Sequence, residues 1–247
     1  MDTEKIIALA GLLRNISRVA ILTGAGISAE SGVPTFRGKD GLWNQFRAED
    51  LATPEAFERD PALVWQWYNW RRGLIAKVEP NPAHKVLAQW ERAFPSFVLI
   101  TQNVDGLHKK AGSTNILELH GNIWKVRCTK ESTVEENYLF PLPEIPPRCP
   151  ACKALLRPHV IWFGESLDPA ILNKAFAFST SCEVMFAIGT SAFIQPAASF
   201  PIAAAEAGAK IVEINPDPTP LTYYADFSFR EKAGEILPLI NDYLNKK

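Results

Sequence analysis

Apolar residues recur along the chain with two spacings, and each spacing predicts one type of element. Ile6, Leu9, Leu13 and Ile16 recur every three or four positions, which predicts an amphipathic helix over residues 3–16. Short apolar runs rich in β-branched residues are typical of buried strands instead. Such runs occupy residues 19–23, 96–101, 115–119, 185–188 and 211–214.

Further helices are predicted between and after these strands. Thr53 followed by Pro54 is a typical helix start, because threonine can accept a backbone N–H bond at the N-cap and proline suits the first helical position. This start lies in a helical module that begins near residue 48. The apolar pattern predicts further helices over residues 61–72, about 83–92 and 236–244.

The first predicted strand ends in a glycine turn, Gly24-Ala25-Gly26. With Ala29 in the third small-residue place, the spacing fits the Gly-x-Gly-x-x-Gly/Ala fingerprint of dinucleotide sites, although a turn that merely joins a strand to a helix is the alternative. A dehydrogenase would continue into a second strand that ends in an acidic residue. Residues 34–43 are too rich in turn formers for that, so a dehydrogenase is not favoured.

Polar or small residues follow three other predicted strands, at 102–105, 189–191 and 215–217. In an open α/β sheet, ligands bind beyond the carboxyl ends of the strands, so these residues are candidates for a nucleotide site. Asn103 and Asp105 together offer the donor and the acceptor that a ligand amide needs. The alternative is that they only cap the following helix.

His120 follows the predicted strand at 115–119 and precedes Gly121. Its ordinary pKa of about 6.5 suits a general base near neutral pH, and the glycine can leave one face of the ring open. His108 and His159 are weaker candidates, and His84 is expected to be structural.

Tyr68 and Arg71 lie three positions apart on the predicted helix over 61–72, so their side chains share one face. A guanidinium fork suits a carboxylate, and the phenol adds one donor. A surface arginine beside a packed tyrosine is the alternative.

Three of the four cysteines cluster in the sequence at Cys128, Cys149 and Cys152. A zinc ribbon has two Cys-x-x-Cys pairs separated by 15 to 20 residues, and 17 residues separate Glu131 from Cys149 here. Glu131 occupies the place of the fourth cysteine. A zinc site with a carboxylate ligand and an eroded site held by packing both stay open.

The composition excludes some partners. The net charge of −1 provides no basic field, so nucleic acid and anionic membranes are not expected as partners. No apolar run has the length of a membrane span and the N-terminus does not look like a signal peptide, so a cytoplasmic protein is expected.

The segment from Gly24 to Arg37, Gly-Ala-Gly-Ile-Ser-Ala-Glu-Ser-Gly-Val-Pro-Thr-Phe-Arg, resembles the signature of the sirtuins, which are NAD-dependent protein lysine deacylases. Gln102–His108, Leu-His-Gly at 119–121 and Gly-Thr-Ser at 189–191 extend the resemblance over nearly the whole chain.

The resemblance implies NAD as a co-substrate and His120 as the catalytic base. Asn103 and Asp105 would hold the nicotinamide carboxamide, Gln102 would contact the ribose, and Phe36 would screen the ribose from water. The implied NAD-binding residues are Gly24, Ala25, Gly26, Ser28, Ala29, Glu30, Thr35, Phe36, Arg37, Trp43, Gln102, Asn103, Asp105, Gly189, Thr190, Ser191, Asn215, Pro216, Asp217 and Ala233.

Tyr68-x-x-Arg71, with Thr35 and Ala52, is similar to the class III sirtuins, which remove acidic acyl groups such as succinyl and malonyl. By this resemblance Tyr68 and Arg71 bind the acyl carboxylate and Ala52 leaves room for the chain. Residues 155–165 resemble the segment whose backbone pairs with the substrate peptide, which tolerates many protein sequences. The substrate-site candidates there are Val160, Phe163 and Gly164.

The implied reaction transfers the acyl group to a ribose hydroxyl of NAD, with His120 as the base that removes the hydroxyl proton. The products would be free lysine, nicotinamide and O-acyl-ADP-ribose. A plain NAD-dependent deacetylase and a non-catalytic NAD or acyl-peptide binding module are the alternatives.

The fold prediction is an α/β protein with a doubly wound, Rossmann-like parallel sheet and a small helical plus zinc-ribbon-like module formed by two insertions. Residues 1–37, 80–120 and 158–247 would form the NAD-binding domain, and residues 38–79 and 121–157 the small module. The active site would lie in the cleft between them, in a monomer.

Overall fold

The computed structural model describes residues 2–36 and 41–246, apart from the side chain of Trp43. Strands within the described residues form a large parallel sheet in the order β3-β2-β1-β7-β8-β9. Because β1 is central and the chain winds outward from it in both directions, the sheet is doubly wound. Its strands are β1 (Arg18–Thr23), β2 (Ser96–Thr101), β3 (Ile116–Glu118), β7 (Val184–Ile188), β8 (Lys210–Ile214) and β9 (Phe227–Phe229).

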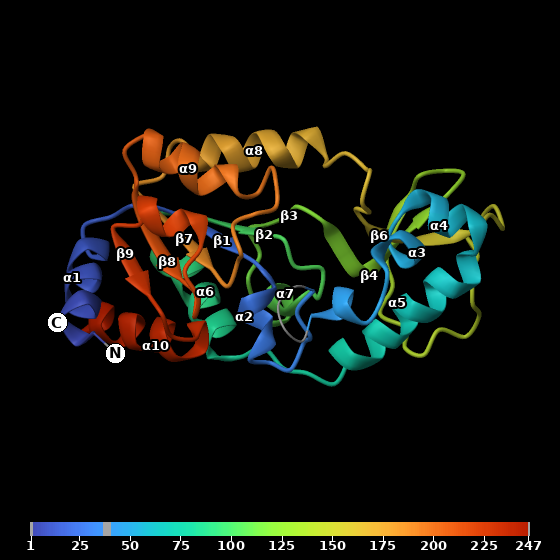
Figure 1. Cartoon of the computed structure of the whole chain (residues 1–247), viewed down its shortest axis with the longest axis horizontal. Helices are drawn as coiled ribbons and strands as arrows, with labels where there is room; N and C mark the ends of the chain where they lie inside the picture. The colour runs from blue at the N-terminus through green and yellow to red at the C-terminus, as the bar shows by residue number, and fades with distance from the viewer. Residues whose placement is uncertain (1, 37–40, 247) are drawn as a thin grey trace.

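Alternate residues of these strands face opposite layers of helices. Ile21, Leu99 and Phe186 lie in the core cluster that packs on α1 (Thr3–Leu13), α6 (Pro82–Ala93) and α10 (Ala233–Asn245). Leu22 and Ile100 lie in the cluster under α8 (Pro169–Ser179) and α9 (Ser199–Glu206). The two layers are visible in Figure 1 below and above the sheet. Apolar residues on both faces are what a buried parallel sheet requires.

A smaller part of the molecule lies at the far end of the long axis, on the right in Figure 1. Its antiparallel sheet has the order β5-β4-β6, with β4 (Gly121–Cys128), β5 (Val134–Glu136) and β6 (Leu156–Val160). Its own apolar cluster includes Trp65 and Trp67. The helical elements there are η1 (Leu42–Asn44), α3 (Ala48–Leu51), α4 (Pro54–Arg59) and α5 (Pro61–Ile75).

Local signals explain where several helices begin. Thr53 accepts a bond from the Ala56 amide at the start of α4, and Asp60 accepts one from the Leu63 amide at the start of α5. Each of these helices has proline in its first turn, as the sequence predicts for α4. The remaining elements are α2 (Ala25–Ala29), α7 (Leu107–Lys110) and η2 (Pro220–Tyr224).

The predicted fold class is confirmed, with small changes at element ends. The first helix ends at Leu13 and not at residue 16, and the strand predicted at 115–119 is limited to Ile116–Glu118. The domain boundaries stay a prediction, and β6 runs past residue 157 to Val160.

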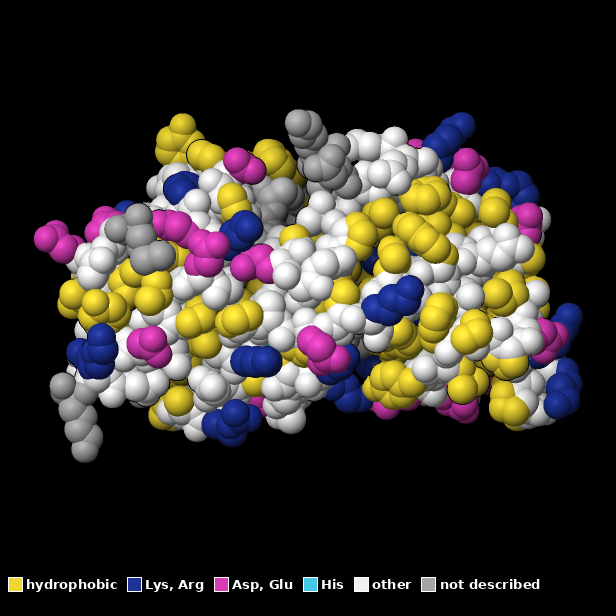
Figure 2. Space-filling view, turned by 90° about the horizontal axis from the view of Figure 1, so that it is seen from below, with side chains coloured by type: hydrophobic (Ala, Val, Ile, Leu, Met, Phe, Trp, Pro, Cys, Tyr) yellow, Lys and Arg dark blue, Asp and Glu magenta, His cyan; other side chains and the backbone are white. Residues whose placement is uncertain are grey.

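The surface has no concentrated basic face in the view of Figure 2, where positive and negative side chains are interspersed and hydrophobic ones gather over the smaller part. None of the described helices is both long and apolar enough to span a membrane.

Candidate functional site

A cavity of about 850 Å³ extends from the carboxyl ends of β1, β2, β7 and β8 to helix α5 and residues 160–165. It therefore joins the large sheet to the smaller part. The predicted residues that line it are Gly24, Ala25, Gly26, Ala29, Glu30, Thr35, Phe36, Ala52, Tyr68, Arg71, Gln102, Asn103, His120, Val160, Phe163, Gly164, Gly189, Thr190, Ser191, Asn215, Pro216, Asp217 and Ala233.

Four predicted NAD-binding residues are not placed on this wall. Ser28 and Asp105 are buried behind it and do not line the cavity. Arg37 lies outside the described residues, and so does the side chain of Trp43.

The glycine turn after β1 lies against the turn after β7. The Gly26 amide donates to the Gly189 carbonyl at 2.8 Å. A Cβ atom on Gly26 would lie 2.7 Å from the Gly189 Cα, and Gly189 itself has a φ of +59°. Glycine is therefore needed at both positions for the two turns to touch, whatever ligand lies beside them.

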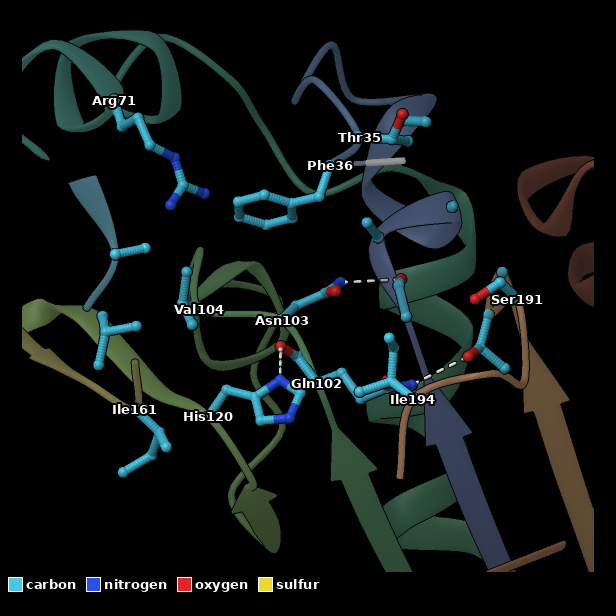
Figure 3. Close-up of a pocket in the computed structure, with 18 of the residues that line it drawn as sticks. Thr35, Phe36, Arg71, Gln102, Asn103, Val104, His120, Ile161, Ser191 and Ile194 are labelled. Atoms are coloured by element: carbon cyan, nitrogen blue, oxygen red, sulfur yellow. Dashed lines mark hydrogen bonds between the residues drawn. The ribbon is translucent and has the colours of Figure 1, made fainter. Parts of the chain in front are cut away.

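Hydrogen bonds fix the polar side chains at the strand ends. The Gln102 amide donates to the Thr190 hydroxyl at 3.0 Å. Asn103 donates to the Gly24 carbonyl at 3.0 Å and to the Ser28 hydroxyl at 3.1 Å, so its own carbonyl oxygen remains as an acceptor (Figure 3).

Asp105 contributes to the start of the following helix. One of its carboxylate oxygens accepts the Leu107 amide at 2.9 Å, at the first residue of α7, so the capping alternative holds in part for Asp105. Burial raises the pKa of its carboxyl, although bonds to Leu107 and Ser28 oppose that rise. Asn103 does not cap the helix.

Glu30, which follows α2, is hydrogen-bonded to the last helix. Its carboxylate accepts the Gly234 amide at 2.9 Å, at the start of α10. Ala233, one of the residues predicted to bind NAD, precedes Gly234 and lines the same cavity.

One ring nitrogen of His120 is hydrogen-bonded to the protein. Its Nδ1 lies 3.0 Å from the Gln102 carbonyl oxygen, which can only accept, so Nδ1 carries the hydrogen (Figure 3). Burial lowers the pKa of the imidazole. At neutral pH the ring is therefore uncharged, and Nε2 has the free lone pair that a general base needs.

The other histidines do not reach the cavity. His108 is buried and bonds to the Thr23 hydroxyl at 3.0 Å. His84 bonds to Asn81 at 3.0 Å, and burial lowers its pKa to about 4. A structural role for His84 stays a prediction.

The opposite end of the cavity contains a buried cation. Arg71 is 4% exposed, and its guanidinium lies 4.5 Å from the centre of the Phe36 ring and 5.0 Å from that of Trp67. Figure 3 shows the Phe36 ring beside it. No hydrogen bond or ion pair joins Arg71 to a described residue. Burial lowers its pKa, and the charges of Tyr68 and Asp105, when ionised, oppose that shift.

Residues 160–165 complete the wall. The Ile161 amide donates to the His120 carbonyl at 2.9 Å, and the Phe163 amide donates to the Ala52 carbonyl at 3.0 Å. The Trp162 amide donates to the Glu165 carboxylate at 2.8 Å. Because these three N–H groups are engaged, a peptide strand that pairs here must use other backbone groups of the segment.

Sequence reasoning missed part of the lining. Most of the missed residues are apolar or aromatic and sit in runs that look like ordinary core, so their type carried no signal. They are Trp67, Val104, Ile161, Trp162, Glu165, Leu167, Ile194, Gln195, Ile214 and Lys232.

The three cysteines converge as predicted. The sulfur atoms of Cys128, Cys149 and Cys152 lie within 4.8 Å of one another, which suits zinc–sulfur distances of about 2.3 Å. The Glu131 carboxylate is not in this group: it is half exposed and lies 3.6 Å from Lys130. The cysteines would hold a zinc ion, and as placed the Glu131 side chain does not complete the site.

Comparisons with known proteins agree with this geometry. The Sir2 family profile matches residues 24–196. A protein from Aquifex aeolicus (strain VF5), named NAD-dependent protein deacylase, is 57% identical over 229 residues, which are 93% of this chain and 96% of that protein. A Sir2 homologue solved as an NAD complex is 47% identical with a TM-score of 0.89, over 98% of this chain and 94% of that one.

A third relative is a Sir2 protein bound to a myristoylated histone peptide. It is 30% identical with a TM-score of 0.78, over 98% of this chain and 97% of that one. Since the profile covers most of the chain and the relatives match nearly all of it, this protein belongs to the Sir2 family, the sirtuins.

Proposed function

We propose that this protein is an NAD-dependent protein lysine deacylase that prefers succinyl and malonyl groups to acetyl. The observation that carries the acyl preference is Arg71, a buried guanidinium that lines the cavity without a hydrogen bond or ion pair to any described residue. A buried charge is costly unless it is paired, and a ligand carboxylate would pair it.

The end of the cavity at the turns after β1 and β7, called the nucleotide end below, supports a requirement for NAD. The turns after β1 and β7 bring backbone groups together where a pyrophosphate would lie, as in other dinucleotide sites. The Asn103 carbonyl oxygen would accept from the nicotinamide carboxamide, because both Asn103 amide hydrogens are engaged elsewhere. NAD would supply the ribose to which the acyl group is transferred.

His120 lies between the two ends. Its Nδ1–H bond to the Gln102 carbonyl fixes the ring, and Nε2 would take the proton of a ribose hydroxyl as that oxygen attacks the acyl carbon. Before this step, the acyl oxygen would attack the ribose carbon that carries nicotinamide, so that this carbon–nitrogen bond breaks and nicotinamide leaves. After it, water would release the free amine of lysine and O-acyl-ADP-ribose. Relatives named NAD-dependent protein deacylase support this assignment.

At the acyl end, Tyr68 and Arg71 would bind the distal carboxylate beside the small side chain of Ala52. A charge-assisted hydrogen bond contributes roughly 1.5 to 3 kcal/mol, which corresponds to about 10- to 150-fold in preference over acetyl.

The test compares one peptide that carries either succinyl-lysine or acetyl-lysine, with and without NAD, by mass spectrometry. We expect deacylation only with NAD and a higher kcat/KM for the succinyl peptide. In Arg71→Met the succinyl activity should fall about 10- to 150-fold, because the charge that pairs the carboxylate is lost, while the acetyl activity changes little.

Arg72→Met is the matched control. Arg72 is buried on the same helix, but it donates to the Ile123 carbonyl at 2.9 Å and does not line the cavity. Its loss should reduce stability and leave the ratio of the two activities unchanged. Equal losses of both activities in Arg71→Met would contradict the acidic acyl preference, and an absence of nicotinamide release would contradict the deacylase itself.

A further inference from the structure

A hydrogen bond joins helix α5 to the 160–165 segment. The indole Nε1 of Trp162 donates to the Tyr68 hydroxyl oxygen at 2.9 Å, between residues that are 94 positions apart. Both side chains are buried, with 3% and 1% of their surface exposed, and both line the cavity. The bond therefore lies at the place proposed for the acyl carboxylate.

The direction of this bond decides what the phenol can do. An indole N–H is a donor only, so the Tyr68 oxygen must be the acceptor, and the phenol hydrogen is left for another partner. Arg71, one turn further along the helix, offers only donors. No acceptor among the described residues takes the phenol hydrogen. Burial raises the pKa of Tyr68, so the hydroxyl keeps this hydrogen at neutral pH.

The indole is itself held in one orientation. The Arg157 guanidinium lies 3.5 Å from the centre of the Trp162 ring and binds the Glu165 carboxylate with two bonds, of 2.6 and 2.9 Å. Glu165 also accepts the Trp162 amide at 2.8 Å. The ring of Phe57 packs against the indole with 5.4 Å between ring centres. A fixed donor on Trp162 gives the Tyr68 hydroxyl a fixed direction as well.

We propose that Trp162 is a positioning residue that makes Tyr68 an obligate hydrogen-bond donor to the acyl group, and so contributes to the selection of acyl groups that end in a carboxylate. This inference rests on the proposed function. A carboxylate has only acceptors and can receive both the Tyr68 hydroxyl and the Arg71 guanidinium. An acetyl group presents a methyl group in that region and gains nothing from the donor.

The test is Trp162→Phe, which removes the N–H group and keeps an aromatic ring. We expect the KM for the succinyl-lysine peptide to rise about three- to tenfold, the effect of one lost hydrogen bond. The KM for the acetyl-lysine peptide, the KM for NAD and both kcat values should stay unchanged. A purely structural role would not produce this split.

Trp65→Phe is the matched control. Trp65 is fully buried in the same apolar cluster and donates its indole N–H to the Leu156 carbonyl at 2.7 Å, and not to Tyr68. The Trp65→Phe variant loses a hydrogen bond of the same type, so its melting temperature should fall at least as much as that of Trp162→Phe. Its KM for the succinyl peptide should match that of the wild type.

A double-mutant cycle with Tyr68→Phe identifies the route of the effect. Because Trp162 acts through the phenol, adding Trp162→Phe to Tyr68→Phe should cause no further rise in the succinyl KM. A full additional rise, or an equal effect on both acyl peptides, would show that Trp162 acts by packing and would overturn the inference.

The same measurements separate this inference from the proposed function. A wild-type enzyme that shows no preference for the succinyl peptide would overturn both. A wild type that prefers succinyl, together with a Trp162→Phe variant of unchanged succinyl KM, would overturn the inference alone.

Discussion

The two ends of the cavity are built in different ways. The nucleotide end consists of turns and short polar side chains that follow directly after strands, such as Gly24 and Gly26 after β1 and Gly189 after β7. The acyl end consists of long side chains from separate segments, and the bond between Trp162 and Tyr68 spans 94 positions. The position of the backbone at the strand ends determines the geometry of the nucleotide end. The packing of side chains determines the geometry of the acyl end.

This difference implies that the two ends can be disturbed separately. A change that separates the turns after β1 and β7 should weaken nucleotide binding for every acyl substrate. A change at Tyr68, Arg71 or Trp162, which line the cavity, should alter the choice of acyl group and leave the nucleotide site intact. His120 lies between the two ends, so its loss should lower the turnover of every acyl substrate and leave NAD binding intact.

The largest effect is expected for His120→Ala. Removal of a general base should lower kcat roughly 100- to 10,000-fold for succinyl and acetyl peptides alike. NAD binding, measured by calorimetry, should be retained because, among the described residues, the ring hydrogen-bonds to the Gln102 carbonyl alone and supports no other side chain of the cavity. His159→Ala is the control, since His159 does not line the cavity, and it should keep full turnover. Normal turnover in His120→Ala would remove His120 from the mechanism.

A smaller and one-sided effect is expected for Gly26→Ala. The new Cβ would lie 2.7 Å from the Gly189 Cα, and overpacking of this type costs roughly 1 to 3 kcal/mol. NAD affinity should fall about 5- to 150-fold by calorimetry, with the succinyl-to-acetyl ratio unchanged.

Gly11→Ala controls for the substitution itself. Gly11 lies within α1, and no atom approaches within 4 Å of its added Cβ, so this variant should be slightly more stable than the wild type. If Gly26→Ala also changed the ratio of succinyl to acetyl activity, the prediction that the two ends act independently would be wrong.

The smallest effect on catalysis is expected from removal of zinc. Cys128, Cys149 and Cys152 do not line the cavity, so treatment with a chelator should lower the melting temperature and leave turnover unchanged below that temperature. Cys152→Ser should abolish the response to the chelator. Cys182→Ser should keep it, because Cys182 is buried outside the cluster. Loss of turnover in a chelated, still folded protein would contradict this prediction.

The contrast between the ends also explains what the sequence could predict. Glycine spacing and the polar residues after each strand predicted most of the cavity lining at the proposed nucleotide end, because parallel strands bring their carboxyl ends to one edge. The same pattern could not show that Ser28 and Asp105 are buried and do not line the cavity, since that depends on how α2 and the segment after β2 pack.

At the proposed acyl end, the helical spacing and the resemblance predicted Tyr68 and Arg71, and both line the cavity. It could not identify Trp162, because an aromatic residue in an apolar run looks the same whether it fills a core or orients a phenol. It also could not place the Glu131 side chain, whose pairing with Lys130 is a choice among surface rotamers.

The order of the large sheet has a consequence for how such a protein can diversify. The residues of the acyl end belong to two excursions from the sheet, one between β1 and β2 and one between β3 and β7. Both leave a strand and return to another strand of the same framework, so insertions or exchanges within them do not alter the register of the strands. Evolution or engineering can therefore exchange the parts of these excursions around Tyr68 and Arg71 and at residues 160–165, provided that His120 and residues 24–36, which lie at the start of the same excursions, are kept.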